Sequence, residues 1–343
     1  MKKLYEDLIK RVFDAMVKNR PALAKFVVVD EDDEDDAIDP RLLGDLIIRN
    51  FPWPVGVELR RLFSGSMRQL DRMRLDQIFK TIERSMQFMS FIMISQLWRD
   101  VANGLIMVPD SFKKDFESRF SVLSMGNYAW IIRMLTKFYS EQERDWFLPE
   151  TVEFDSKFLN ALDFWVPERN EIGHYQINLT QEDIEKRCVE YEDKLAFILE
   201  KLSFLVKYKL VSVREIKVVK PKNQDPVFQH SVDILNSSDS GFKIQEIDET
   251  KFTDTQSVLL MKSIKSIDEY LNLSPLIIDT NCEVINDKEK FDIKKDIFMF
   301  TKFRSDHLMY VGTEVTEKCD LRSLSNYANL LQEYKDLVKV VCG

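Results

Sequence analysis

The chain has 343 residues and a mass of 40.5 kDa, which exceeds the usual size of a single hydrophobic core, so two domains are expected. Its composition, 45% hydrophobic and 31% charged, is typical of a folded globular protein and excludes an intrinsically disordered chain. The net charge of −9 excludes a domain-wide basic field for nucleic acid, although it leaves room for a local basic face.

Membrane and metal functions find little support in the sequence. The most apolar stretch, residues 85–98, is shorter than the roughly 18 residues that span a bilayer and is flanked by charge, so it predicts a buried core helix. Acidic and basic residues interrupt the apolar region that a signal peptide would need, so we expect none in the first segment. The four cysteines lie far apart, whereas zinc needs clustered Cys and His. We therefore expect a cytoplasmic protein with reduced thiols, no metal, no cofactor and no membrane partner.

The first part of the chain shows helical periodicity almost throughout. Helices are expected at residues 4–16, 41–50, 66–103, 111–120, 123–140, 155–165 and 180–206. The prolines of "FPWP", residues 51–54, should break regular structure between the second and third helices. Thr180 and Asp183 fit a capping box at the start of the last helix. Residues 1–207 are thus predicted to form an all-α helical bundle.

The character of the sequence changes after residue 207. Short β-favouring runs occur at residues 210–221, 241–248, 276–285, 296–303 and 308–315. Residues 252–272 and 325–341 are expected to form helices. Residues 208–343 therefore predict a small β-rich α+β domain, which makes the fold α+β overall. His230 and His307 stand alone in it and are expected to be surface or hydrogen-bonded core residues.

Charged residues of the first domain suggest a weak nucleic-acid contact. A basic cluster there could meet phosphates, and its members are Arg60, Arg61, Arg68, Arg72, Arg74, Lys80 and Arg84, of which the first four are the candidate RNA contacts. The simpler interpretation of this cluster is a solvated helix face. An acidic run at residues 30–36 is expected to be a solvated loop, because it lacks the spaced glycine and closing glutamate of a calcium-binding loop.

The stretch "PERNEIGHYQINLT", residues 167–180, holds one of only three histidines in the chain. On a helix, Asn170 and His174 project from the same face, and Arg169 lies to one side within reach. Histidine can move protons near neutral pH, and arginine can stabilise charge on phosphorus oxygens. The set suits cleavage of a phosphodiester without a metal. Cleavage calls for both an acid and a base, so two copies facing each other across a homodimer would complete the site. The alternative is that Asn170 and His174 only cap and pack a helix–loop–helix corner.

The segment from residue 168 to residue 210 resembles the HEPN superfamily of all-helical, nucleic-acid-associated domains. The family signature is an arginine, a polar residue, a few further residues and then a histidine that follows a small residue. Arg169, Asn170, Gly173 and His174 match this signature, and a capped long helix begins at Thr180 as the pattern expects.

The resemblance implies a metal-independent endoribonuclease with Arg169, Asn170 and His174 as catalytic residues and RNA as substrate. It also implies a role as a regulated toxin or antiviral-defence effector. The C-terminal domain would then bind a regulatory partner or ligand. The alternative function is a catalytically silent adaptor or a nucleotide-binding sensor.

Overall fold

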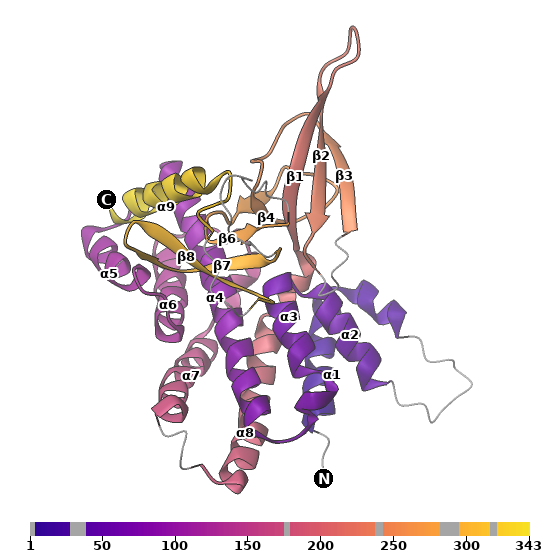
Figure 1. Cartoon of the computed structure of the whole chain (residues 1–343), viewed down its shortest axis with the longest axis vertical. Helices are drawn as coiled ribbons and strands as arrows, with labels where there is room; N and C mark the ends of the chain where they lie inside the picture. Colours follow the sequence, from indigo (N-terminus) through magenta and orange to yellow (C-terminus); the bar gives the residue numbers. More distant parts are fainter. Residues whose placement is uncertain (1–3, 28–38, 175–178, 237–242, 282–294, 316–320) are drawn as a thin grey trace. The chain divides into compact units, whose positions relative to one another are not determined.

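The computed structural model describes residues 4–27, 39–174, 179–236, 243–281, 295–315 and 321–343 (Figure 1). The acidic run at residues 30–36 lies outside them. The chain is α+β, as the sequence predicts, with helices in its N-terminal part and two antiparallel sheets in its C-terminal part. No helix in the described part of the chain is long and apolar enough to cross a bilayer.

The chain divides into two compact units. The first comprises Met1–Met86, Glu150–Tyr208 and Asn236–Ser240, and the second comprises Gln87–Pro149, Lys209–Leu235 and Gly241–Gly343. This division does not follow the boundary expected at residue 207, because residues 87–149 of the helical region belong to the second unit.

The first unit is built from helices. They are α1 (Leu4–Asn19), α2 (Pro40–Asn50), α3 (Trp53–Leu62), the first half of α4 (Arg72–Ala102), α7 (Ser156–His174) and α8 (Gln181–Lys201). Short 3-10 turns occur at Pro21–Phe26, Gly65–Arg68, Pro149–Glu153 and Ser203–Lys207. The apolar stripe of α1 is buried, and this helix packs against α2 and α8. As predicted, α2 ends before "FPWP". The two prolines then start α3, a helix that the periodicity did not reveal.

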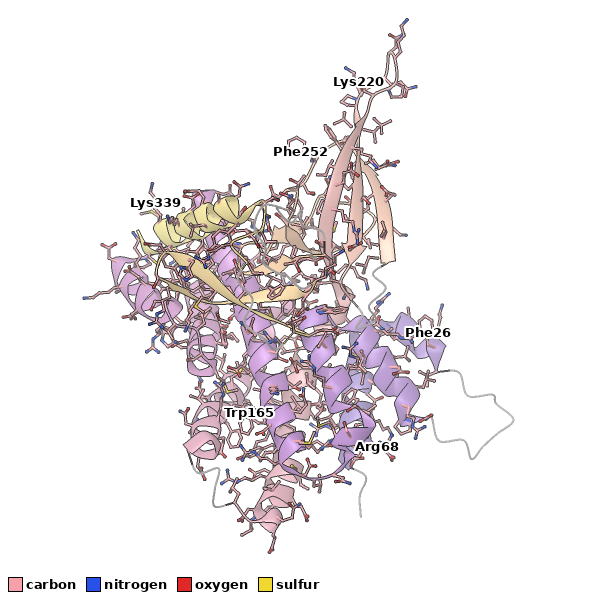
Figure 2. The ribbon with its side chains drawn as sticks, viewed as in Figure 1. Phe26, Arg68, Trp165, Lys220, Phe252 and Lys339 are labelled. Carbon is pink, nitrogen blue, oxygen red and sulfur yellow. The ribbon has the colours of Figure 1, made fainter. Side chains whose placement is uncertain are left out.

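The second unit combines helices with the two sheets. Its helices are the second half of α4, α5 (Asp110–Phe120), α6 (Met125–Glu141) and α9 (Tyr327–Cys342). One sheet has the order β3-β2-β1-β4-β5, with β1 (Lys209–Val219), β2 (Val227–Ile234), β3 (Lys243–Glu249), β4 (Val258–Met261) and β5 (Tyr270–Asn272). The other has the order β6-β7-β8, with β6 (Ile277–Asp279), β7 (Ile297–Arg304) and β8 (His307–Gly312). The β1–β2 hairpin is long, and Lys220 lies near its tip (Figure 2).

Direct contacts explain why residues 87–149 belong with the sheets. The side-chain amide of Gln87 donates a hydrogen bond to the backbone carbonyl of Phe300 at 3.0 Å. The ring of Phe120 stacks on Tyr334 of α9, with centroids 5.7 Å apart. Aromatic packing of this kind buries large apolar areas, so α5 and α4 share one core with β7 and α9.

One sequence prediction in this unit was wrong. Residues 252–272 form no helix and instead contain β4 and β5. Strand β4 lies between β1 and β5, and all four of its residues are buried. A strand covered on both faces is a continuous apolar run, which periodicity cannot separate from a buried helix.

A buried aspartate fixes the end of β8. Asp296 accepts hydrogen bonds from the backbone N–H groups of Glu314 and Val315, each at 2.9 Å, and from the Thr313 hydroxyl at 2.8 Å. The chain passes close to this carboxylate at Gly312, where a Cβ atom would meet Asp296 Oδ2 and would lie 2.7 Å from the carbonyl oxygen of Val315.

Gly312→Ala is therefore expected to destabilise the protein by about 1–3 kcal/mol, the usual cost of forcing an extra methyl into a packed site. Gly65→Ala is the matched control, because nothing lies within 4 Å of its added Cβ. Thermal unfolding of both variants checks the prediction. Equal melting temperatures for the two variants would contradict it, because the added methyl group would then fit beside Asp296 without a loss of stability.

Candidate functional site

The motif residues lie at the C-terminal end of helix α7, after a proline in the helix interior. The helix continues to His174, past the predicted end at residue 165, and contains Pro167 in its interior. A proline lacks a backbone N–H and so removes one helical hydrogen bond, but it does not end this helix. Asn170 and His174 are thus four residues apart on one helix, as the motif requires. The side chain of His174 lies outside the part of the chain that the structure describes.

Arg169 lies at the surface and forms an ion pair with α4. Its guanidinium is 3.0 Å from the carboxylate of Glu83, and the two side chains are 44% and 29% exposed. No second partner for Arg169 exists among the described residues. A guanidinium has five N–H donors, so this single contact leaves donors of Arg169 for an incoming anion.

Glu83 belongs to a charged network that the sequence did not reveal. Burial raises the pKa of the Glu83 carboxyl, while the nearby Arg169 and Arg84 favour its charged form. Arg84 also lies 3.8 Å from the buried carboxylate of Glu58 on α3. Glu58 in turn pairs with Arg61 at 2.9 Å. Charged groups from α3, α4 and α7 therefore act on the Glu83 carboxylate, and Arg169 is one of them.

Other side chains hold the α7–α8 corner together. The buried indole of Trp165 packs edge-on against Tyr191 of α8, with centroids 5.4 Å apart (Figure 2). The Tyr191 hydroxyl donates to the carboxylate of Glu168. Arg187 of α8 binds Glu171 at 2.7 Å. Asn170 and Arg169 are exposed and take no part in these contacts.

The start of α8 confirms the predicted capping box. The backbone N–H of Asp183 donates to the Thr180 hydroxyl at 3.2 Å, and the backbone N–H of Thr180 donates to the Asp183 carboxylate at 3.2 Å. Hydrogen bonds from Thr180 lower the pKa of the Asp183 carboxyl. The helix that follows the motif therefore begins at a fixed residue.

The four arginines expected to contact RNA differ in their surroundings. Arg61 pairs with Glu58, and Arg72 pairs with Asp76 at 2.9 Å, so a carboxylate offsets the charge of each. Arg68 is exposed and its guanidinium lies 5.8 Å from the ring centre of Tyr5. Arg60 is partly buried. Arg61 is linked to Arg169 through Glu58, Arg84 and Glu83. Arg74 of the same expected cluster is buried against Glu192 and is not part of a surface.

His230, one of the isolated histidines of the second unit, is hydrogen-bonded inside the fold. His230 is buried, its Nδ1 lies 3.0 Å from the carbonyl of Phe228, and its Nε2 accepts the backbone N–H of Thr253 at 3.2 Å. This pattern confirms a hydrogen-bonded core histidine. Among the described residues, no three histidine, cysteine, aspartate or glutamate side chains are grouped so that they could hold a metal ion.

Comparisons with protein-family models, curated proteins and solved structures found no match to this chain.

Proposed function

We propose that the protein is a metal-independent endoribonuclease of the HEPN type, with Arg169, Asn170 and His174 as its catalytic residues. One observation carries the proposal: Arg169 and Asn170 lie exposed on α7, while the packing of the corner comes from Trp165 and Glu168. Exposed polar side chains that contribute little to packing are free to bind a substrate.

The proposed chemistry is attack of a ribose 2′-hydroxyl on the neighbouring phosphorus. The new O–P bond forms as the bond to the 5′-oxygen breaks, which leaves a 2′,3′-cyclic phosphate and a 5′-hydroxyl. His174 takes the proton of the 2′-hydroxyl or supplies one to the leaving 5′-oxygen. Arg169 binds the non-bridging oxygens as negative charge builds up on them, and the Asn170 amide donates a further hydrogen bond.

The motif contains a single histidine, which can carry out only one of the two proton transfers of cleavage. A second copy of the chain is therefore expected to face the first and to supply the other. Light scattering at micromolar concentration should therefore give the mass of a dimer. His174→Ala should leave that mass unchanged, because the variant removes chemistry and keeps the surface that pairs the copies. A purely monomeric protein, both with and without RNA, would count against the two-copy site.

The role proposed for the protein is that of a regulated toxin or antiviral-defence effector. The α+β unit would then restrain or trigger cleavage when it binds a regulatory partner or ligand. What supports this division of labour is that the motif residues and the sheets belong to different compact units.

A second function is favoured by one specific observation, the ion pair between Arg169 and Glu83. An arginine held by a carboxylate of its own chain could serve the fold alone, in a catalytically silent adaptor or a nucleotide-binding sensor. Because both side chains are partly exposed, however, such a pair contributes only about 0–1 kcal/mol. Arg169→Ala separates the two functions: a nuclease loses activity at nearly unchanged stability, whereas a structural arginine changes stability and leaves any activity per folded molecule unaltered.

A further inference from the structure

The second compact unit contains a pocket of about 810 Å³ with a mixed polar and apolar lining. Its wall comes from the end of α4, the segment 252–257 before β4, strand β5 and the start of α9. Phe252, in that segment, is labelled in Figure 2. The volume falls within the range of small-molecule sites in proteins.

Two carboxylates line this pocket, and the groups that donate hydrogen bonds to them are neutral. The side-chain amide of Asn272 donates to Asp254 at 2.8 Å, and the Ser274 hydroxyl donates to Glu333 at 2.8 Å. In the part of the chain that the structure describes, neither carboxylate has a cationic partner. Asp254 is exposed and Glu333 is partly buried. The pocket therefore presents negative charge to whatever enters it.

The arginine that lines the pocket does not offset this charge. Arg99 forms an ion pair with Asp100 at 3.2 Å, and its guanidinium lies 5.6 Å from the ring centre of Phe147. The carboxylate of Asp100, which is not part of the lining, thus offsets the charge of Arg99. Burial raises the pKa of the Glu333 carboxyl, and Asp254 raises it further by like-charge repulsion. A cation between these two groups would relieve that repulsion.

Two further polar atoms of the lining lack partners. Ser95 and Asn326 are 2% and 7% exposed, and neither Ser95 Oγ nor Asn326 Oδ1 makes a hydrogen bond within the described residues. Asn326 is the N-cap of α9, a position where the side chain usually accepts a helix N–H, yet it makes no cap bond. A buried polar atom left without a partner costs about 1–3 kcal/mol. Both residues line the pocket, so a change of side-chain rotamer would turn either oxygen toward a ligand N–H group.

Aromatic side chains complete the lining. Trp98, Phe252 and Tyr270 contribute to the wall, alongside the carboxylates and amides. The faces of aromatic rings attract ammonium groups and also pack against methylene chains. Two carboxylates would repel a phosphate, so the pocket disfavours nucleotides and other anions.

We propose that this pocket binds a small organic cation, a ligand with one or more ammonium groups on a short chain. Asp254 and Glu333 face the ammonium groups, Ser95 and Asn326 accept their N–H donors, and the aromatic rings cover the chain. The proposal concerns the second unit alone and does not depend on RNA cleavage.

Calorimetric titration of the full-length protein with putrescine, agmatine and spermidine tests it, at about 150 mM salt to suppress diffuse charge attraction. At least one amine should bind saturably. 1,4-Butanediol, the neutral analogue of putrescine, should bind at least about tenfold more weakly, a difference of about 1.4 kcal/mol. Succinate, the anionic analogue, should not bind.

The double variant Asp254→Asn, Glu333→Gln should weaken amine binding about tenfold or more. The matched control Glu246→Gln, Asp248→Asn removes the same charge from exposed positions on β3 and should change binding less than about twofold. Each single variant is titrated as well, so that a folding failure of the double variant leaves the test in place. The proposal is overturned if no amine binds below about 10 mM, if the diol binds as tightly, or if the pocket variants bind like the control.

Discussion

His174→Ala is expected to slow RNA cleavage by about 10²–10⁴-fold, the usual loss when one general acid or base is removed. Arg169→Ala should cost a comparable factor, because a charge-assisted contact to the developing phosphorane charge disappears. Initial rates on a labelled RNA, normalised to folded protein, measure both effects. The ion pair of Arg169 with Glu83 is partly exposed, so the variant should lose no more than about 1 kcal/mol of stability.

Two control variants distinguish the loss of a catalytic group from the loss of a positive charge or an imidazole ring elsewhere in the protein. His307→Ala removes a histidine of the second unit, and Lys10→Ala removes an exposed positive charge from α1 of the first unit. Both controls should cleave RNA within about threefold of the wild-type rate, since surface substitutions rarely change stability or function. If His174 serves only the α7–α8 corner, His174→Ala should instead lower the melting temperature by several degrees and leave the rate per folded molecule unchanged.

Arg74→Met is expected to destabilise the first unit by about 3–5 kcal/mol, because it leaves a buried carboxylate without its partner. Arg74 and Glu192 are 1% and 2% exposed and are joined by two contacts, one of them 3.2 Å long. Arg74 also donates to the backbone carbonyl of Met67. A loss of this size corresponds to roughly 6–20 °C in melting temperature for a unit of this length.

The pH dependence of this loss has a defined sign. Burial raises the pKa of the Glu192 carboxyl, and Arg74 counteracts the increase. Without Arg74 the folded state binds a proton more tightly than the unfolded chain does, so the stability of the variant should fall as the pH rises through the folded-state pKa. Arg72→Met is the matched control, since its partner Asp76 is 47% exposed, and it should cost no more than about 1 kcal/mol. An Arg74→Met variant as stable as this control would contradict the account.

Local patterns in the sequence predicted the helical part well. The apolar stripe of α1 and the capping box of α8 both depend on residues within one or two turns, and both are confirmed. Helix α9 at Tyr327–Cys342 also agrees with the expected range.

Tertiary context decided the features that the sequence could not predict. Strand β4 is covered on both faces, and its apolar run therefore resembled a helix. Residues 87–149 read as helices like their neighbours, and only distant contacts such as Phe120 with Tyr334 assign them to the second unit. A fragment that ends at residue 207 would lose these contacts, so truncation there is not a clean way to isolate the motif.

The candidate site was predicted in part. Arg169, Asn170 and His174 share a helix as their spacing indicates, but Glu83 lies 86 residues before Arg169 in the sequence and no local pattern links them. The pocket that contains Asp254 and Glu333 combines four separate segments, and no single segment carries both carboxylates. Sites of this kind follow from the packing of elements and not from periodicity.

Incubation of the pure wild-type protein with labelled transfer and messenger RNA in EDTA separates a metal-independent nuclease from a silent adaptor. We expect internal cleavage without a metal, products that end in a 2′,3′-cyclic phosphate and a 5′-hydroxyl, and about 10²–10⁴-fold slower cleavage by Arg169→Ala and His174→Ala. RNA that stays intact with folded wild-type protein would contradict this expectation. So would a stable His174→Ala variant that cleaves as fast as the wild type.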